Sequence, residues 1–317
     1  MRILVLGAGA TGGYFGGRLL QAGRDVTFLV RPGRAAELAL SGLVIKSPHG
    51  DVTLANPQTV TAENLSGTYD LILLSCKAYD LDEASAAIAP AVGAETMILP
   101  LLNGVRHLEV LDNRFGRSKV LGGRCVIAAT LDEERAVVHL NELHLISFGE
   151  RDGTQSNRIE QLAGVLRDCG FHAIASENIL QEMWEKWVFL ATLAAITCLM
   201  RAPLGVINAT PGGADLLQQL FDECCAIAAA AGFTPRKEFI KQSQAFMSTP
   251  DSPLTASMMR DLEAGYRIEA DHVIGDLLGR RTVSGGDSGH VSILQVAYTH
   301  LKAYELRCLA APAESSA

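Results

Sequence analysis

The segment that most constrains the fold of this chain is a glycine motif close to its start. A short apolar run at 2–6 leads directly into Gly7-Ala8-Gly9-Ala10-Thr11-Gly12, and a helix-like stretch follows at about 12–22. Glycines at this spacing, between a strand and a helix, let the backbone turn tightly and approach a pyrophosphate, which the free N–H groups of the helix start attract. The motif therefore predicts a dinucleotide site contacted by Gly7, Gly9, Ala10, Thr11 and Gly12, although a glycine-rich turn without a ligand is the alternative.

The first half of the chain alternates between strand-like and helix-like segments. Apolar runs at 26–30, 69–75 and 96–102 are separated by helix-like stretches, a pattern typical of a parallel sheet covered on both faces. Strands expected at 120–130, 136–140 and 143–149 have no long helix between them, so they predict an antiparallel edge that closes the domain. We expect an α/β Rossmann-like, doubly wound sheet over residues 1–175.

The character of the sequence changes from about Ser176. Long helical patterns follow, with Pro and Gly between them, and they predict a mainly α-helical C-terminal domain over residues 176–317. A glycine-rich loop is expected at 284–289 and a frayed tail from Ala310. The predicted helices span 178–200, 212–231, 235–247, 255–280 and 290–306.

Composition excludes several classes of function. The net charge of -8 and the lack of a Lys/Arg run argue against nucleic acid as a partner. The seven cysteines are odd in number and scattered, which indicates reduced thiols. The N-terminal apolar run is too short for a signal peptide, and no apolar run approaches the 18 or more residues of a membrane span. We expect a soluble, cytoplasmic protein that does not bind a membrane.

The histidines do not suggest a metal. His107, His139, His144, His172, His272 and His290 show no ligand spacing, and no Cys/His group has the spacing of a zinc site. No metal site is predicted.

Cofactor choice is read at the end of the second strand, where an acidic residue would bind the ribose of NAD. Here Arg31 follows the strand and Arg34 lies one turn later, whereas Asp25 comes too early to reach the ribose. A guanidinium offers a fork of donors suited to a 2′-phosphate. NADP(H) is favoured, with a solvated arginine at a strand end as the alternative; the sequence does not decide between Arg31 and Arg34.

These features, together with several downstream segments, resemble the ketopantoate reductase (2-dehydropantoate 2-reductase) family over nearly the whole chain. Each segment alone is weak, but their order and spacing as a set are specific. The segments are Ser75-Cys76-Lys77-Ala78-Tyr79, Leu102-Asn103-Gly104-Val105, Asn178-Ile179 through Trp187, and Ser257-Met258-Met259-Arg260 through Glu269.

The resemblance implies a role for each matching residue. Lys186 would be the general acid that protonates the substrate carbonyl oxygen as hydride arrives from the nicotinamide, and Glu269 would orient it. Asn103 would bind both the substrate and the cofactor ribose, while Ser257 would bind the substrate carboxylate and Lys77 would lie near the cofactor. The implied activity is NADPH-dependent reduction of ketopantoate or a related 2-keto acid, as in pantothenate biosynthesis, in a cleft between the domains.

The residues themselves agree with this in part. Lys186 is flanked by apolar and aromatic side chains, so its ammonium is expected to be partly desolvated, which lowers a lysine pKa; the alternative is a lysine that reaches out to water. Ser257 and Glu269 belong to a four-residue recurrence that predicts one shared helix face. Asn103 and Lys77 follow strands at the ends where parallel sheets hold ligands, although Asn-Gly is also a common turn pair.

One departure from the family pattern concerns the substrate. In ketopantoate reductases the lysine is commonly followed, four and eight residues later, by asparagines that hold the hydroxyl end of the substrate; here those positions are Leu190 and Ala194. Thr192 and Thr197 are expected to point elsewhere. The pocket would thus have a more apolar wall, suited to a bulkier alkyl or aryl 2-keto acid.

Three readings remain open. The first is the reductase described above. The second is a related enzyme that acts on a different, more apolar carbonyl, or on an imine. The third is an NADPH-binding sensor without turnover, which the combined presence of a proton donor and its partners argues against. A homodimer through the helical domain is a further candidate, with the helix at 187–200 as a contributor.

Overall fold

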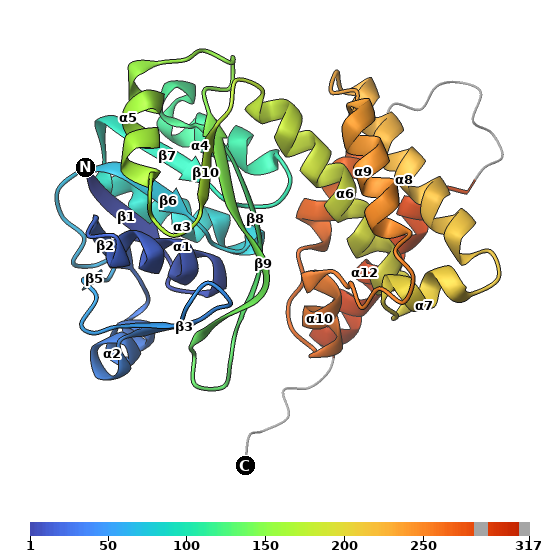
Figure 1. Ribbon diagram of the computed structural model, residues 1–317, viewed down its shortest axis with the longest axis horizontal. Coiled ribbons are helices and arrows are strands. Elements are labelled where there is room, and N and C mark those ends of the chain that lie inside the picture. The colour runs from blue at the N-terminus through green and yellow to red at the C-terminus, as the bar shows by residue number, and fades with distance from the viewer. Residues whose placement is uncertain (282–290, 311–317) are drawn as a thin grey trace. The chain divides into compact units, whose positions relative to one another are not determined.

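The computed structural model describes residues 1–281 and 291–310, and the chain divides into two compact units, Met1–Met183 and Trp184–Ala317 (Figure 1). The loop expected at 284–289 and the tail beyond Ala310 lie outside the described residues. The first unit ends eight residues later than the boundary expected at 175/176 (183 against 175). The reason is local: Ser176 donates a 2.8 Å backbone hydrogen bond to Phe148, and Glu182 pairs with Arg124 at 3.2 Å, so 176–183 packs with the first unit.

The first sheet of the N-terminal unit is parallel, with strand order β5-β2-β1-β6-β7. The central strand β1 leads into the glycine motif, which places that motif at the carboxyl edge of the sheet. The expected Rossmann-like sheet is confirmed. Its strands are β1 (Arg2–Leu6), β2 (Asp25–Leu29), β5 (Thr59–Val60), β6 (Tyr69–Leu74) and β7 (Val92–Pro100).

A second sheet corrects the expectation of an antiparallel edge on the first. The predicted hairpin forms, but it belongs to a separate sheet of order β10-β9-β3-β4 in which β8 also pairs with β9. The two strands expected at 136–140 and 143–149 are one long strand. The strands are β3 (Leu43–Lys46), β4 (Val52–Leu54), β8 (Gly122–Leu131), β9 (Val137–Gly149) and β10 (His172–Ala175).

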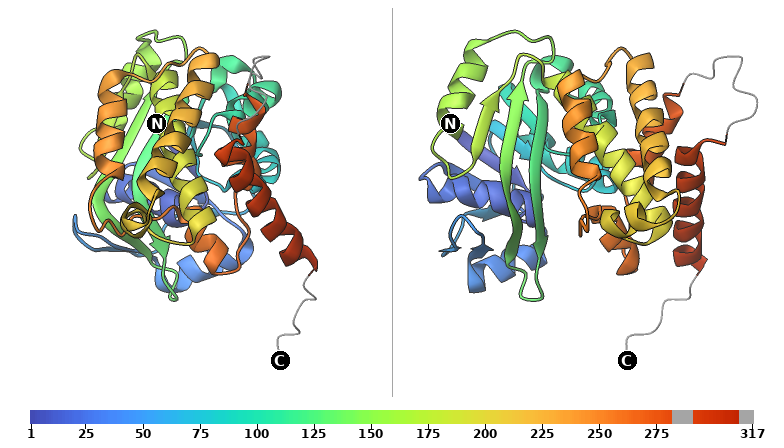
Figure 2. Two further views of the ribbon diagram at one scale, coloured as in Figure 1. Left: turned by 90° about the vertical axis from the view of Figure 1, so that its right-hand side faces the viewer. Right: turned by 45° about the vertical axis from the view of Figure 1, so that its right-hand side comes forward.

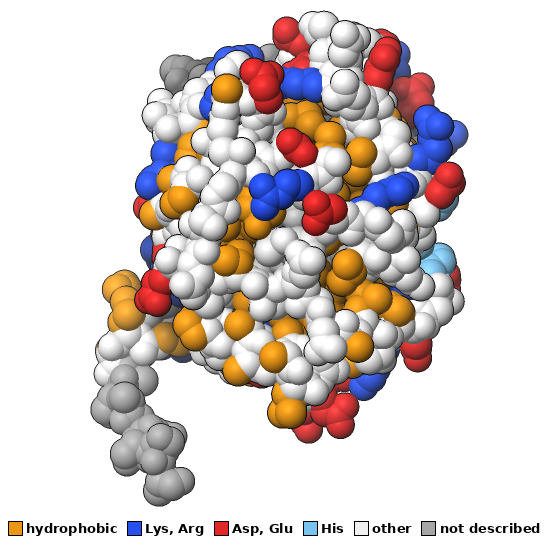
Figure 3. Space-filling view, turned by 90° about the vertical axis from the view of Figure 1, so that its left-hand side faces the viewer, with side chains coloured by type: hydrophobic (Ala, Val, Ile, Leu, Met, Phe, Trp, Pro, Cys, Tyr) orange, Lys and Arg blue, Asp and Glu red, His pale blue; other side chains and the backbone are white. Residues whose placement is uncertain are grey.

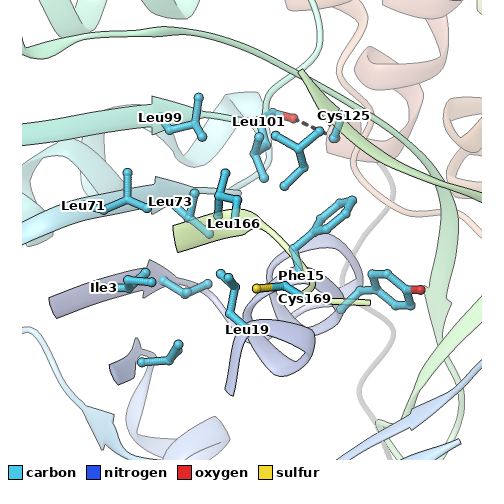
Figure 4. Close-up of a cluster of buried hydrophobic side chains, with 14 of the residues drawn as sticks. Ile3, Phe15, Leu19, Leu71, Leu73, Leu99, Leu101, Cys125, Leu166 and Cys169 are labelled. Carbon is cyan, nitrogen blue, oxygen red and sulfur yellow. Dashed lines mark hydrogen bonds between the residues drawn. The ribbon is translucent and has the colours of Figure 1, made fainter. Parts of the chain in front are cut away.

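Helix α1 (Ala10–Gln21) contacts strands of both sheets and lies between them (Figure 2). Its glycines permit this, because a Cβ on Gly16 would lie 2.7 Å from Phe28 of the first sheet, and one on Gly17 would lie 2.6 Å from Ile45 of the second. Figure 4 shows Phe15 and Leu19 of α1 among core side chains such as Leu73. The other helices of the unit are α2 (Pro32–Ser41), α3 (Leu81–Ile88), α4 (Arg106–Phe115) and α5 (Asn157–Leu166), with short 3₁₀ turns η1 (Ala78–Asp80), η2 (Ala89–Ala91) and η3 (Arg117–Lys119).

The outer face of this unit is an ordinary solvated surface. Figure 3 shows acidic and basic side chains interspersed over it, with apolar side chains between them. Several acidic and basic side chains of the unit pair with each other, for example Lys46 with Asp132 at 2.7 Å.

The second unit is helical, as expected. Helix α6 (Ile179–Met200) is apolar on all sides, and Trp187, Ala191 and Ile196 are fully buried, so it forms the centre of this unit. By length and composition α6 would pass as a membrane span, but 72% of its most apolar window is buried in the protein, as in a core helix. The remaining elements are α7 (Leu204–Ala209), α8 (Gly213–Ala230), α9 (Lys237–Met247), α10 (Ser257–Glu263), the π-helical turn η4 (Asp271–Gly275), α11 (Asp276–Gly279) and α12 (Ile293–Ala310).

The single helix expected over 255–280 is wrong. Helix α10 ends at Glu263, and Gly265 has a φ of +75°, which an uninterrupted helix does not allow. The chain then runs without regular structure through Glu269 before the π-helical turn begins. Ser257 and Glu269 therefore do not share one helix face.

Candidate active site

The glycine motif closes tightly onto the strands around it. Gly7 has a φ of +90° and donates a 2.9 Å hydrogen bond to the carbonyl oxygen of Leu29 on β2. A Cβ on Gly12 would lie 2.2 Å from the carbonyl oxygen of Gly7 and 2.3 Å from Oγ of Ser75. Gly7 and Gly12 are thus required by the fold of the loop itself.

Gly9 is different, because the space next to it is open. A Cβ built on Gly9 meets no heavy atom within 4 Å among the described residues. Gly9 is the N-cap of α1, no side chain caps this helix start, and no acidic residue lies in its first turn. A cradle of this kind, at the positive end of a helix, fits the pyrophosphate of a dinucleotide.

Arg31 lies at the position that the sequence analysis considered, two residues after the end of β2 and at the N-cap of α2. Its side chain is 70% exposed and pairs with Glu83 of α3 at 3.0 Å and with Asp80 at 3.8 Å. The guanidinium is accessible, but two carboxylates already neutralise part of its charge.

Arg34 has a different role in the structure. Its Nε and Nη2 donate to the carbonyl oxygen of Ala8, at 3.2 and 3.0 Å, and Nη2 also donates to the carbonyl oxygen of Arg135 at 3.1 Å. Its Nη1 pairs with Glu37 at 2.9 Å. Arg34 therefore stabilises the glycine loop through its hydrogen bonds to Ala8. The sequence analysis missed this role because the contact links residues in different elements.

Lys77 and Asn103 follow the carboxyl ends of two neighbouring strands. Lys77 comes three residues after β6 and is the N-cap of η1, while Asn103 comes three residues after β7. Gly104 next to it has a φ of +73°, as the Asn-Gly turn requires. Since β6 and β7 are parallel neighbours beside β1, both residues lie at the edge of the sheet that carries the glycine loop.

In the second unit, the residues on either side of Lys186 are each anchored. Glu185 is 3% exposed and accepts three hydrogen bonds from Arg236, from the backbone N at 2.9 Å, Nε at 2.9 Å and Nη2 at 2.5 Å. Trp187 is fully buried and donates from Nε1 to the carbonyl oxygen of Val273 at 2.8 Å. The backbone at Lys186 is consequently fixed to α9 on one side and to η4 on the other.

An aromatic cluster surrounds this part of α6. Trp184 stacks on Phe233, with ring centroids 5.0 Å apart, and contacts Trp187 at the same distance. The guanidinium of Arg280 lies 5.7 Å from both indole rings. Neither the Trp187 bond nor this cation could be read from local sequence patterns.

Glu269 and Ser257 are held by backbone bonds of their segments. The carbonyl oxygen of Glu269 accepts from the N–H of Val273 at 2.9 Å, so Glu269 lies just before the helical segment that Trp187 contacts and is bonded to it. Ser257 is the first residue of α10, and the N–H of Ala256 before it donates to Thr197 Oγ1 on α6 at 3.4 Å. Both predicted site residues are thus tied to α6 by different contacts.

Leu190 and Ala194 lie one and two turns after Lys186 on α6. The nearby hydroxyls do not replace the missing amides, since Thr192 donates to the carbonyl oxygen of Val188 at 2.8 Å and Thr197 to that of Leu193 at 2.7 Å. Both hydroxyls donate within their own helix, and that of Thr197 also accepts from Ala256. The Thr192 and Thr197 hydroxyls therefore do not change the apolar character that Leu190 and Ala194 give to this part of α6.

Two family models match the chain. Residues 3–153 match the model described as ketopantoate reductase PanE/ApbA, and residues 178–303 match the model of its C-terminal part. Together they span most of the chain.

Individual relatives agree with this. An uncharacterized oxidoreductase, YkpB of Bacillus subtilis, is 36% identical over 96% of this chain and 99% of its own length. A 2-dehydropantoate 2-reductase of Archaeoglobus fulgidus is 30% identical over 90% of this chain and 92% of its own. Among solved structures, the 2-dehydropantoate 2-reductase of Geobacter metallireducens has a TM-score of 0.84 and 28% identity, and it covers 96% of this chain and 99% of its own. A D-mandelate dehydrogenase solved with NADH and anilino(oxo)acetate shares the fold, with a TM-score of 0.85, 20% identity and coverage of 98% and 100%.

Proposed function

Because the chain belongs to the ketopantoate reductase family and is an oxidoreductase, we propose that it reduces a 2-keto acid to the 2-hydroxy acid with NADPH, and that Lys186 is the general acid. The observation that carries the proposal is the double anchoring of Lys186. The ion pair of the buried Glu185 on one side and the indole hydrogen bond of Trp187 on the other fix the backbone of Lys186, as proton transfer to a defined atom requires.

The proposed reaction transfers one hydride and one proton to the carbonyl group of the substrate. The nicotinamide, when bound, supplies the hydride that adds to the carbonyl carbon of the substrate. Lys186 gives a proton from Nζ to the carbonyl oxygen, which becomes the hydroxyl, and recovers it from solvent afterwards. Glu269 orients Lys186 and the substrate, and Ser257 binds the substrate carboxylate.

We propose that the first unit binds the cofactor. Gly7, Gly9, Ala10, Thr11 and Gly12 hold the pyrophosphate at the start of α1, and Lys77 and Asn103 bind nearer the nicotinamide. Arg31 binds the 2′-phosphate and releases Glu83 to do so, since Arg34 is already engaged with the glycine loop. The carboxylates of Glu83 and Asp80 beside Arg31 repel a 2′-phosphate, so NADH is the competing cofactor.

For the substrate, we propose a 2-keto acid with a larger apolar side chain than ketopantoate. The side chains of Leu190 and Ala194 offer no hydrogen bond to a substrate hydroxyl, and the hydroxyls of Thr192 and Thr197 both donate to backbone carbonyl oxygens of α6. A pocket without polar partners gains little from a hydroxyl and more from an alkyl or aryl group.

The test is NADPH consumption by the purified protein, with NADH as control, against ketopantoate and a panel of branched, linear and aromatic 2-keto acids. Lys186→Ala should abolish turnover while cofactor binding, followed by fluorescence, persists. Glu185→Gln is the matched variant, because it weakens the anchor and keeps the lysine, and it should retain measurable turnover. Cofactor binding without turnover of any acid, unchanged by Lys186→Ala, would instead identify a sensor.

The proposal extends to the location and the oligomeric state of the protein. We propose that the protein works in the cytoplasm and as a homodimer. Light scattering on the purified chain tests the second point, since a single mass equal to one chain contradicts it.

A further inference from the structure

Three histidines gather on the second sheet of the N-terminal unit, away from the glycine loop. His139 and His144 belong to β9, and His49 lies on the turn between β3 and β4. One ring nitrogen from each lies within 4.8 Å of the other two. His139 and His144 are buried, at 4% and 6% exposure, and His49 lies at the surface.

An irregularity in β9 creates the cluster. Ala129 of β8 pairs with His139 and Ile127 pairs with His144, so residues 140–143 bulge out of the ladder. The bulge brings together two histidines whose spacing of five residues on a regular strand would direct them to opposite faces. This is why the sequence predicted no metal site here.

The hydrogen bonds of the rings fix where the lone pairs are. His49 Nε2 bonds the carbonyl oxygen of Glu142 at 2.9 Å, and His139 Nε2 bonds the carbonyl oxygen of Leu143 at 3.0 Å. A carbonyl oxygen only accepts, so both Nε2 atoms carry the proton, and Nδ1 is the lone-pair atom in each neutral ring. In His139 this Nδ1 accepts from the Ser47 hydroxyl at 3.0 Å, so the hydroxyl must turn away when an ion binds. Metal-bound histidines commonly donate their other N–H to a backbone carbonyl in this way.

The third ring is compatible with the same role. His144 Nδ1 lies 2.7 Å from the hydroxyl of Tyr14, which can accept its proton and leave Nε2 as the lone-pair atom.

One positively and one negatively charged side chain lie next to the three histidines. Arg18, whose charge opposes a cation, donates to the carbonyl oxygen of Gly50 at 2.6 Å and to Gln21 at 2.8 Å. On the other side, a carboxylate oxygen of Glu142 lies 3.4 Å from His49 Nε2. His172 also contacts His144, with ring centroids 5.6 Å apart.

We propose that His49, His139 and His144 bind one Zn²⁺, with water as a fourth ligand. At Zn–N bonds of about 2.0–2.1 Å in a tetrahedron, ligand nitrogens lie roughly 3.3 Å apart, so the rings must close by up to about 1.5 Å. His49 and His144 are stacked at 3.7 Å, and the His49 ring must turn for both to face one ion. His49 is on an exposed turn that allows this movement. The ion would fasten the β3–β4 turn to β9, independently of the reductase reaction.

Zinc binding by the full-length chain tests the proposal. The protein is produced without a polyhistidine tag, stripped with a chelator and titrated with ZnCl₂ by calorimetry, and with Co²⁺ by visible absorption. We expect one Zn²⁺ per chain, a Co²⁺ spectrum of a tetrahedral site, and a rise in Tm when Zn²⁺ is added. His49→Ala should weaken binding by more than the roughly 10- to 100-fold typical of losing an outer-shell partner, and Tyr14→Phe by about that amount.

The control is His172→Gln, which changes a neighbouring histidine that is outside the triad. Binding by this variant should match the wild type. Because His49 is exposed, His49→Ala should fold, and circular dichroism checks this. The proposal is overturned if the wild type shows no saturable binding, or if His49→Ala binds Zn²⁺ as tightly as the wild type does.

Discussion

Trp187 is joined to Val273 by a 2.8 Å hydrogen bond from its indole Nε1 to the backbone carbonyl oxygen, and both residues are buried. Val273 in turn donates from its N–H to the carbonyl oxygen of Glu269. Trp187 follows the proposed acid Lys186, so two bonds connect the backbone of the acid to that of its proposed orienting partner. A π-helical turn receives the indole, and such turns are frequent at functional sites.

Replacing this indole should lower turnover more than it weakens substrate binding. Trp187→Phe leaves the carbonyl oxygen of Val273 without its donor, which should cost about 1–3 kcal/mol of stability in urea denaturation. A small displacement of Lys186 against Glu269 should lower kcat by about tenfold or more, with little change in KM. Trp184→Phe is the control, since it alters an equally buried indole nearby and keeps the Val273 bond; equal losses of kcat in the two variants would argue against a positioning role.

Much of the architecture could be predicted from the periodicity of apolar residues and from the positions of Gly and Pro. Strands β1, β2 and β6 and helices α6 and α8 are close to their expected bounds, because each has a clear apolar pattern, while β7 begins four residues earlier than expected. The short strands β3, β4, β5 and β10 were not predicted, since segments this short carry too little pattern.

What the sequence could not show is contact between distant segments. The helix expected over 255–280 looked continuous because apolar residues recur through it, yet Gly265 breaks it and Glu269 lies outside any helix. In the same way, Arg34 looked like a second phosphate ligand, although its guanidinium reaches back to Ala8. Such contacts depend on tertiary packing, which local propensity does not encode.

The two glycines of the cofactor loop should respond differently to alanine. Gly12→Ala places a methyl group 2.2 Å from a backbone oxygen and should destabilise the protein by about 1–3 kcal/mol or more. Gly9→Ala places it in open space, so the Tm should hardly change while cofactor affinity falls by about tenfold or more. Thermal denaturation and cofactor titration of both variants provide the test, and unchanged affinity in Gly9→Ala would contradict a pyrophosphate at this position.

Alanine variants of Arg31 and Arg34 should have different effects, one on the choice between NADPH and NADH and the other on the stability of the glycine loop. Arg31→Ala removes an exposed guanidinium and should weaken NADPH by about 10- to 100-fold while leaving NADH unchanged, as expected for one charge-assisted contact. Arg34→Ala removes the donors to Ala8 and should weaken both cofactors and lower Tm. Fluorescence titration with each cofactor distinguishes them. Equal NADPH affinity in wild type and Arg31→Ala would favour NADH as the natural cofactor.

Acid should remove one contribution to the stability of the first unit. Two 2.6 Å hydrogen bonds from Arg158 hold the pKa of the Glu150 carboxyl below its usual range. The stabilisation is complete above the unfolded pKa of about 4.3 and is lost as pH falls through the lower folded value. Glu150→Gln should therefore cost on the order of 1 kcal/mol at pH 7, and the difference should shrink toward pH 3. Urea denaturation across this range measures it, with the exposed Glu133→Gln as control.

The apolar wall after Lys186 should decide which keto acid is reduced. The double variant Leu190→Asn and Ala194→Asn supplies two amides on the face of α6 that carries Lys186. It should raise the kcat/KM for ketopantoate relative to that for an apolar 2-keto acid by about tenfold or more, because a site that hydrogen-bonds a hydroxyl discriminates against acids that lack one. Ala194 is buried, so the single variant Leu190→Asn guards against a folding defect. Leu190→Met keeps the wall apolar and should leave the ratio near that of the wild type. If the ratio does not change in either asparagine variant, the substrate side chain does not contact this face, and the specificity must come from other residues.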